Sequence, residues 1–172
     1  NINKADASIR EIGGVVPMGG EIRGVEGQNE SPSFVLRATS DPKGAHLDRI
    51  QIIKGWIDNG GSVQEKIFNV AWSEESRLDS NGDLAPVGNT VNVKTASYTN
   101  DIGSPTLSAF WQDPDFDMNQ PAFYYARVLQ IPTPRHSLYD AIALGMEHAD
   151  GYPDTIQERA YTSSIWYWPL DL

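Results

Sequence analysis

Apolar and polar residues alternate along much of the chain after residue 33, which is the pattern of a β-strand with one buried face. The alternation is clear from Phe34 to Thr39, and Phe68, Val70 and Trp72 share one face of a predicted strand from Gln64 to Trp72. A further strand is predicted at Ile50–Ile57, which is rich in Ile. Both faces of Ala122–Ile131 are largely apolar, which is typical of a central strand. Other extended segments are predicted at Thr90–Tyr98, Leu107–Trp111 and Thr155–Trp168.

Turn signals separate these strands. The run Asp58-Asn59-Gly60-Gly61 stands between two of them and is typical of a tight hairpin, because Asn and Gly adopt left-handed backbone at low cost. Pro132 and Pro134 end the strand before them, since proline cannot donate to a central ladder. The sequence therefore predicts consecutive antiparallel strands.

Helical signals are few. Ser137 and Asp140 have the spacing of a capping box, which predicts a short helix over Leu138–Leu144 that Gly145 ends. A second short turn is expected between Asp6 and Ile12. No helix long enough for a parallel βαβ crossover lies between successive strands.

These elements predict an all-β fold, an antiparallel β-sandwich of immunoglobulin-like or related type with one or two short helices. Residues 33–172 form the predicted β-sandwich domain. Residues 1–32 form an N-terminal lead-in segment with a short helix and a loop. The length of 172 residues suits one domain.

Composition narrows the classes of partner. Lys and Arg number 13 against 23 Asp and Glu, which gives a net charge of −10. Such a chain repels nucleic acid and anionic membranes, so neither is an expected partner. Cysteine is absent, which excludes disulfides, zinc–thiolate sites and cysteine nucleophiles. The chain begins with Asn1, from which we expect that it is processed, trimmed or cut from a longer one.

The histidines do not form a metal motif, because His46, His136 and His148 are too far apart in sequence. We expect His46 and His148 to be solvated. His136 follows Arg135 at the start of the predicted helix, where unpaired N–H groups favour an anion. The alternative is that Arg135 pairs with a nearby carboxylate such as Asp140 or Glu158.

Carboxylates and tryptophans raise further alternatives. Asp113, Asp115 and Asp117 alternate in one segment, which suits a calcium loop or an acidic turn whose side chains bond their own backbone. No cofactor is expected in this chain, and whether calcium binds is left open. The tryptophans suit either a buried core or a sugar-stacking platform, and the core is favoured; they are Trp56, Trp72, Trp111, Trp166 and Trp168.

A series of short strings in fixed order resembles the C-terminal part of a bacterial family known as domain of unknown function 3604. The strings lie between about Val15 and the end of the chain. They are VPMGG (16–20), LDRIQIIKGW (47–56), VAWS (70–73), GNTV (88–91), YTNDIG (98–103), DPDFD (113–117), AFYYARV (122–128), IPTPR (131–135) and QERAYTSSIWY (157–167).

The resemblance implies an accessory β domain of a secreted metal-dependent hydrolase, related to the polymerase and histidinol phosphatase-like superfamily. The resemblance also implies that a catalytic region with metal-binding motifs precedes this domain. Those motifs have no counterpart in this chain, so no catalytic residue is assigned. The implied partner is the upstream catalytic region of a longer chain, and the implied location is periplasmic or extracellular. The candidate contact or ligand residues are Arg135, His136 and Arg159, near the Thr133–Asp140 corner.

Two other functions stay open. One is a stand-alone module that binds carbohydrate or calcium. The other is an enzyme that uses carboxylates alone, although the sequence shows no readable nucleophile, base or metal set. A contiguous apolar patch on the domain surface would favour docking over both.

Overall fold

The computed structural model describes residues 15–26, 30–74, 77–80, 83–148 and 150–170. Its elements are β1 (Glu21–Arg23), β2 (Ser33–Thr39), β3 (Leu47–Ile57), β4 (Val63–Trp72), β5 (Thr106–Gln112), β6 (Ala122–Gln130), β7 (Thr133–Pro134), α2 (His136–Leu144), β8 (Thr155–Ile156), β9 (Arg159–Tyr161) and β10 (Ile165–Trp168). The helix predicted between Asp6 and Ile12 lies outside the described residues. The mostly β prediction is confirmed.

Six strands form the main sheet, in the order β1-β10-β6-β3-β4, with β9 pairing along β6. Most neighbours are antiparallel, as predicted, but β1 and β10 are parallel. A parallel pair needs a long crossover, and nearly the whole domain lies between these two strands. The purely antiparallel expectation is therefore wrong at this edge, and an immunoglobulin-like topology is not confirmed.

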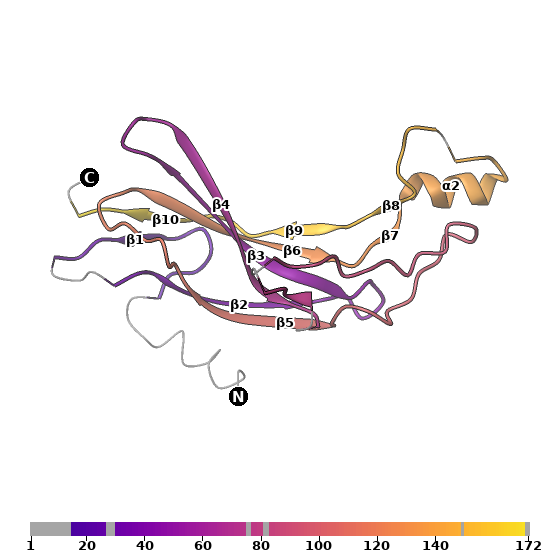
Figure 1. Ribbon diagram of the computed structural model, residues 1–172, viewed down its shortest axis with the longest axis horizontal. Helices are drawn as coiled ribbons and strands as arrows, with labels where there is room; N and C mark the ends of the chain where they lie inside the picture. The colour runs from indigo at the N-terminus through magenta and orange to yellow at the C-terminus, as the bar shows by residue number, and fades with distance from the viewer. Residues whose placement is uncertain (1–14, 27–29, 75–76, 81–82, 149, 171–172) are drawn as a thin grey trace.

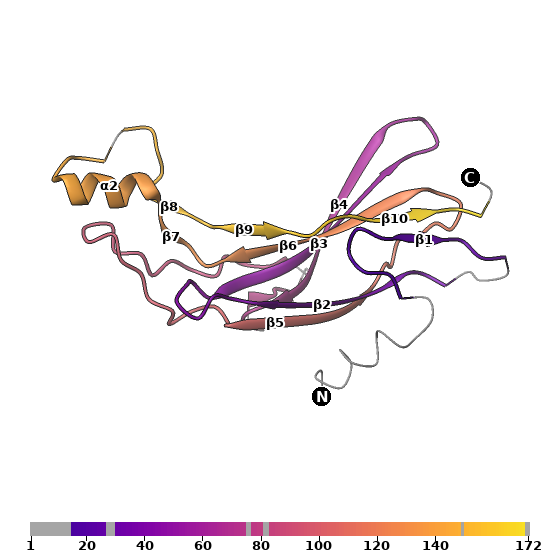
Figure 2. The same cartoon turned by 180° about the vertical axis from the view of Figure 1, so that it is seen from behind.

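Strands β2 and β5 form a separate antiparallel ribbon that covers one face of the main sheet (Figures 1 and 2). The core between the two layers is apolar, and one buried cluster joins Phe34 of β2 to Ile52, Ala122, Tyr124 and Tyr167 of the main sheet. The molecule is elongated, with α2 at one end beyond the short β7–β8 pair (Figure 1).

The β3–β4 hairpin confirms the strongest turn prediction. The N–H of Asp58 donates to the carbonyl of Ser62 at 2.9 Å, and Gly61 has a φ of 79°. That left-handed conformation suits glycine because glycine has no Cβ. The turn joins β4 to the long strand β3, and β3 lies between β4 and β6 in the sheet.

Other local predictions need correction. Thr90–Tyr98 is a turn and not a strand. The Asn92 side chain accepts from the Lys94 N–H, and an isolated antiparallel bridge joins Asn92 to Ser97. The predicted strand Thr155–Trp168 is divided among β8, β9 and β10. Within the predicted lead-in segment, Glu21–Arg23 is the edge strand β1 and not a loop. In the described parts of the chain, no helix has the length and apolar character needed to cross a membrane.

A buried charged cluster lies within the apolar core. The Lys54 ammonium lies 2.6 Å from Oδ2 of Asp113, and the Tyr124 hydroxyl donates to the same oxygen at 2.7 Å. Lys54 also donates to the carbonyl of Asp115 at 2.7 Å. Burial and the Asp113 carboxylate both raise the pKa of Tyr124. The cluster joins β3, β6 and the segment after β5.

Breaking this cluster should strongly destabilise the fold. Asp113→Asn keeps the side-chain shape but leaves the Lys54 charge buried without its counter-ion, and such losses cost about 3–5 kcal/mol. Lys66→Ala is the control, because Lys66 pairs with Asp115 at the exposed surface, where a pair is worth at most about 1 kcal/mol. Urea unfolding measures both changes. Equal effects of the two substitutions would contradict the assigned role of Asp113.

The hairpin turn should weaken in acid. The Asp58 carboxylate accepts from the Ser62 N–H, the Gln64 side chain and the Gly60 N–H, and these bonds lower its pKa from the ordinary 3.8. A lowered folded pKa gives stability that is fully present above the unfolded pKa of 3.8 and is lost as pH falls through the lower, folded value. Protection of the turn amides, measured as the exchange rate relative to that of an unstructured peptide at the same pH, should therefore fall in acid, and Asp58→Ala should lower it at neutral pH. Unchanged exchange in Asp58→Ala at pH 7 would refute this role.

Candidate functional site

The face of the main sheet that points away from β2 and β5 has no described element over it (Figures 1 and 2). Side chains of a strand alternate between faces. Tyr124 is buried in the core, so Phe123 and Tyr125 point to the opposite, open face. Trp166 and Trp168 lie on this face for the same reason, because Tyr167 between them is part of the core.

Aromatic rings form an unbroken row across this open face, which we call the aromatic strip. Ring centroids are separated by 6.2 Å between Tyr161 and Tyr125, 6.3 Å between Tyr125 and Phe123, 5.4 Å between Phe123 and Trp166, and 6.1 Å between Trp166 and Trp168. Tyr161 is 55% exposed and Trp166 is 42% exposed. The strip runs from β9 across β6 to β10.

Aliphatic side chains of the β3–β4 hairpin add to the exposed apolar surface. Ile57, Val63 and Ile67 are 59%, 83% and 45% exposed. The Phe123 ring lies directly over Gly55, where an added Cβ would come within 2.2 Å of the ring. Glycine at this position therefore lets the strip lie close against β3.

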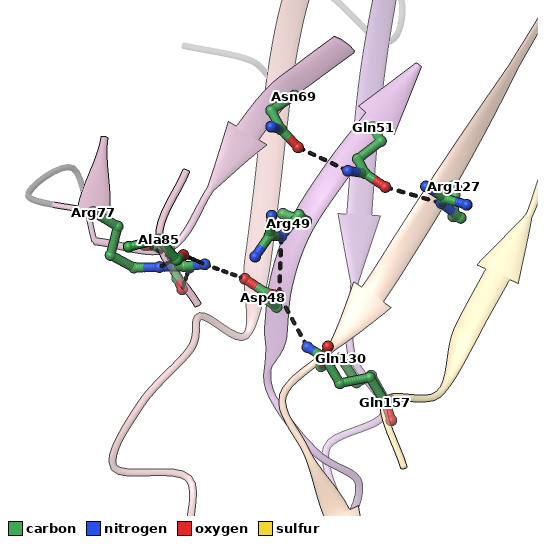
Figure 3. A network of polar contacts seen from close by, with 10 residues as sticks. Asp48, Arg49, Gln51, Asn69, Arg77, Ala85, Arg127, Gln130 and Gln157 are labelled. Atoms are coloured by element: carbon green, nitrogen blue, oxygen red, sulfur yellow. Dashed lines mark hydrogen bonds and ion pairs between the residues drawn. The ribbon is translucent and has the colours of Figure 1, made fainter. Parts of the chain in front are cut away.

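A polar chain borders the strip on the same face (Figure 3). Arg127 of β6 donates to the Gln51 side chain at 2.9 Å, and Gln51 donates to Asn69 of β4 at 2.8 Å. The three side chains cross three neighbouring strands. Because their polar groups bond to one another, they fix the strand register at the edge of the apolar surface.

A second polar cluster, also shown in Figure 3, surrounds the fully buried Asp48. One carboxylate oxygen lies 2.7 Å from the Arg77 guanidinium, and the other accepts from Arg49 and Gln157 at 3.0 Å each. Arg77 also donates to the carbonyl of Ala85 at 2.8 Å. Asp48 is inaccessible to a substrate. Its Oδ1 is held by the ion pair with Arg77 and accepts no hydrogen bond, whereas Oδ2 is hydrogen-bonded, so the role of Asp48 is to hold the loop before β5 against the sheet.

The alternating aspartates have protein partners. Asp113 is bound to Lys54 and Tyr124 inside the core, and Asp115 is paired with Lys66. Asp113 and Asp117 also accept from backbone N–H groups two residues ahead, as predicted for an acidic turn. Among the described residues, no group of three or more His, Cys, Asp or Glu is placed to hold a metal ion.

The predicted contact residues lie in two places. Arg135 and His136 stand at the start of α2, at one end of the molecule, whereas Arg159 is exposed on β9 beside β6 (Figure 1). The Arg135 guanidinium lies 5.9 Å from the centre of the Tyr152 ring, a contact that replaces the pairing with Asp140 or Glu158 considered above. Arg159 lies next to the aromatic strip, because Tyr161 is two residues further along β9.

The start of α2 also contains a hydrogen-bonded group that the sequence did not reveal. Nε2 of His148 lies 2.8 Å from the Ser137 hydroxyl, and Nδ1 of His148 lies 2.9 Å from the Asp154 carboxylate. The expectation that His148 is solvated is wrong, since its side chain is only 12% exposed. The capping-box prediction is also wrong, because α2 begins at His136 after Arg135, without a side-chain cap.

The tryptophans divide between the two faces of the sheet. Trp56 and Trp111 pack against the main core cluster, as predicted. Trp166 instead belongs to the exposed strip. Strand alternation was visible in the sequence, but the layer that covers each face was not.

Comparison with known families gives one result. The family model described as Protein of unknown function (DUF3604) matches residues 1–169. The chain belongs to the DUF3604 family. Neither the curated proteins nor the solved structures contain a match to it.

Calcium should not stabilise this DUF3604 family member through the alternating aspartates, because Lys54 and Lys66 already neutralise two of them. A ligand that favours the native state must raise the melting temperature. We expect an unchanged melting temperature at millimolar calcium. A rise with calcium that Asp117→Asn abolishes would contradict this and restore the calcium-module alternative.

Proposed function

We propose that this chain is an accessory β domain that docks, through the aromatic strip and the apolar side of the β3–β4 hairpin, against another region of its own longer polypeptide. The observation that carries the proposal is the continuous row of rings on an uncovered sheet face. Tyr, Trp, Phe and Arg are the residue types enriched in protein interfaces. Large exposed apolar patches mark interaction sites.

The occupant we propose is the catalytic region of a metal-dependent hydrolase. The support is the ordered set of strings, which resembles the C-terminal part of such proteins. The same resemblance supports a periplasmic or extracellular location. Arg159 and Arg127 border the strip, so this surface is less acidic than the chain as a whole. It therefore does not repel a partner of ordinary acidic charge as strongly as the rest of the chain does.

The aliphatic residues favour a protein over a sugar as the occupant. Saccharides stack on flat rings and need hydrogen-bond partners for their hydroxyls. Val63 and Ile67 extend the exposed surface with branched aliphatic groups, which suit protein packing. Gln51 and Arg127 already bond to each other. Truncation of a tryptophan that is an interface hot spot costs about 2 kcal/mol or more, which is about 30-fold in affinity.

The docking proposal can be tested by expressing this chain and the remainder of its reading frame as separate proteins and measuring their affinity by calorimetry. Trp166→Ala should weaken the complex by about 30-fold or more. Phe110→Ala is the matched control, because Phe110 is 72% exposed on β5, in the other layer. Equal affinities of the two variants, no binding of the wild-type chain, or a reading frame without an upstream region would each overturn the proposal.

Carbohydrate binding is the second candidate function. It is favoured by two nearly parallel ring pairs, with interplanar angles of 9° for Phe123 and Tyr125 and 11° for Trp166 and Trp168. Tryptophan fluorescence titrated with soluble polysaccharides distinguishes the two. A saturable change that Trp166→Ala removes would support the sugar module and contradict docking as the function of the strip.

A further inference from the structure

Ser137, His148 and Asp154 form a linear chain of hydrogen bonds at the end of the molecule opposite β1. Ser137 is in the first turn of α2, and the other two residues are in the loop that returns from α2 to β8. A second contact ties that loop to the helix start, since the N–H of Arg135 donates to the carbonyl of Asp154 at 2.9 Å. Backbone and side-chain contacts therefore fix the same juxtaposition.

The order of the hydrogen-bonded atoms from Ser137 through His148 to Asp154 gives each residue a chemical role. A carboxylate only accepts hydrogen bonds, so Nδ1 of His148 carries the proton that faces Asp154. In the neutral imidazole with this tautomer, Nε2 is the acceptor, and the Ser137 hydroxyl donates to it. This is the arrangement in which a histidine acts as general base for a serine nucleophile and a carboxylate fixes its tautomer.

The helix start supplies the electrostatic part of such a site. The N–H groups of His136 and Ser137 are in the first turn, where no intrahelical acceptor exists. No side chain caps α2, and its first turn contains no acidic residue. No residue of the helix itself therefore neutralises the positive end of its dipole, which can stabilise negative charge that develops beside the Ser137 hydroxyl.

We propose that Ser137 and His148 form an ester-hydrolysing site, with Asp154 as the positioning residue and neutral esters of short acyl chains as substrates. The site is at the surface, where His136 is exposed and the Asp154 side chain is 50% exposed, so it favours a small acyl group over one that needs enclosure. Tyr139 and Tyr152 supply exposed apolar surface beside it. The negative charge of the chain disfavours anionic substrates.

The reaction balances without a further reactant except water. The Ser137 oxygen attacks the carbonyl carbon as its proton passes to Nε2 of His148. The bond to the leaving alkoxide then breaks, and that oxygen takes the proton from Nε2. Water attacks the acyl-serine and gives one proton to Nε2; the acyl bond to Ser137 breaks, the carboxylic acid leaves and the proton returns to the serine oxygen. Asp154 stays ionised throughout.

The competing explanation is a structural clip, in which the same hydrogen bonds only hold the loop against α2. A fluorophosphonate probe separates the two, because it bonds covalently to an activated serine oxygen with loss of fluoride. We expect the 172-residue chain to gain the mass of one adduct, mapped to Ser137 by peptide sequencing. Ser137→Ala should remove the adduct, and Ser163→Ala, a change at an exposed serine before β10, should not.

The base and the positioning residue have their own readouts. His148→Asn should slow labelling by about 100-fold, the lower range for loss of a general base. With p-nitrophenyl acetate, Asp154→Asn should lower kcat and leave KM unchanged, whereas a loosened loop alone would raise KM. Melting temperatures of both variants verify that the fold is retained.

A cysteine variant tests the same proposal if Ser137→Ala does not fold. Ser137→Cys should react with iodoacetamide about 10-fold faster than Ser163→Cys, because a thiol beside a histidine is more readily ionised. Equal rates for the two thiols, or labelling of Ser137 no faster than that of Ser163 in the wild-type chain, would overturn the proposal and leave the structural clip.

Discussion

The buried ion pair between Lys54 and Asp113 is the constraint on which the arrangement of the two layers depends. A charged ammonium inside an apolar core is tolerated only when its counter-ion and hydrogen-bond partners are present. Asp113 and the carbonyl of Asp115 supply them from the segment after β5, and the Tyr124 hydroxyl supplies a third group from β6. This cluster therefore ties the β2–β5 ribbon to one face of the main sheet.

Covering one face leaves the other face open. Alternation along β6 and β10 places the second set of aromatic side chains on that open side, where Gly55 lets Phe123 approach the sheet. The strip is thus a consequence of the layer arrangement and of glycine at one central position. The Asp48 cluster has a complementary role, because it holds the loop before β5 and contributes no accessible chemistry.

The two functional proposals use separate parts of the molecule. The aromatic strip lies on β6, β9 and β10, whereas the Ser137–His148–Asp154 group lies at the α2 end (Figure 1). A docking domain that completes a larger protein and a surface site with its own nucleophile are compatible, since neither needs the other's residues. The DUF3604 family is described as one of unknown function, so membership assigns neither role. Each role is argued from the residues of its own site.

The sequence by itself determined the local structure: the strands of period two, the Asp58 turn, the end of α2 at Gly145 and the family. These depend on neighbouring residues, whose propensities and spacing are visible in the chain. Tertiary structure decided the parallel β1–β10 pair, the open face that exposes Trp166, and the partners of Asp113. It also decided that Ser137 bonds to His148 and does not cap its helix. Each of these depends on residues brought together by the chain path, which no local pattern encodes.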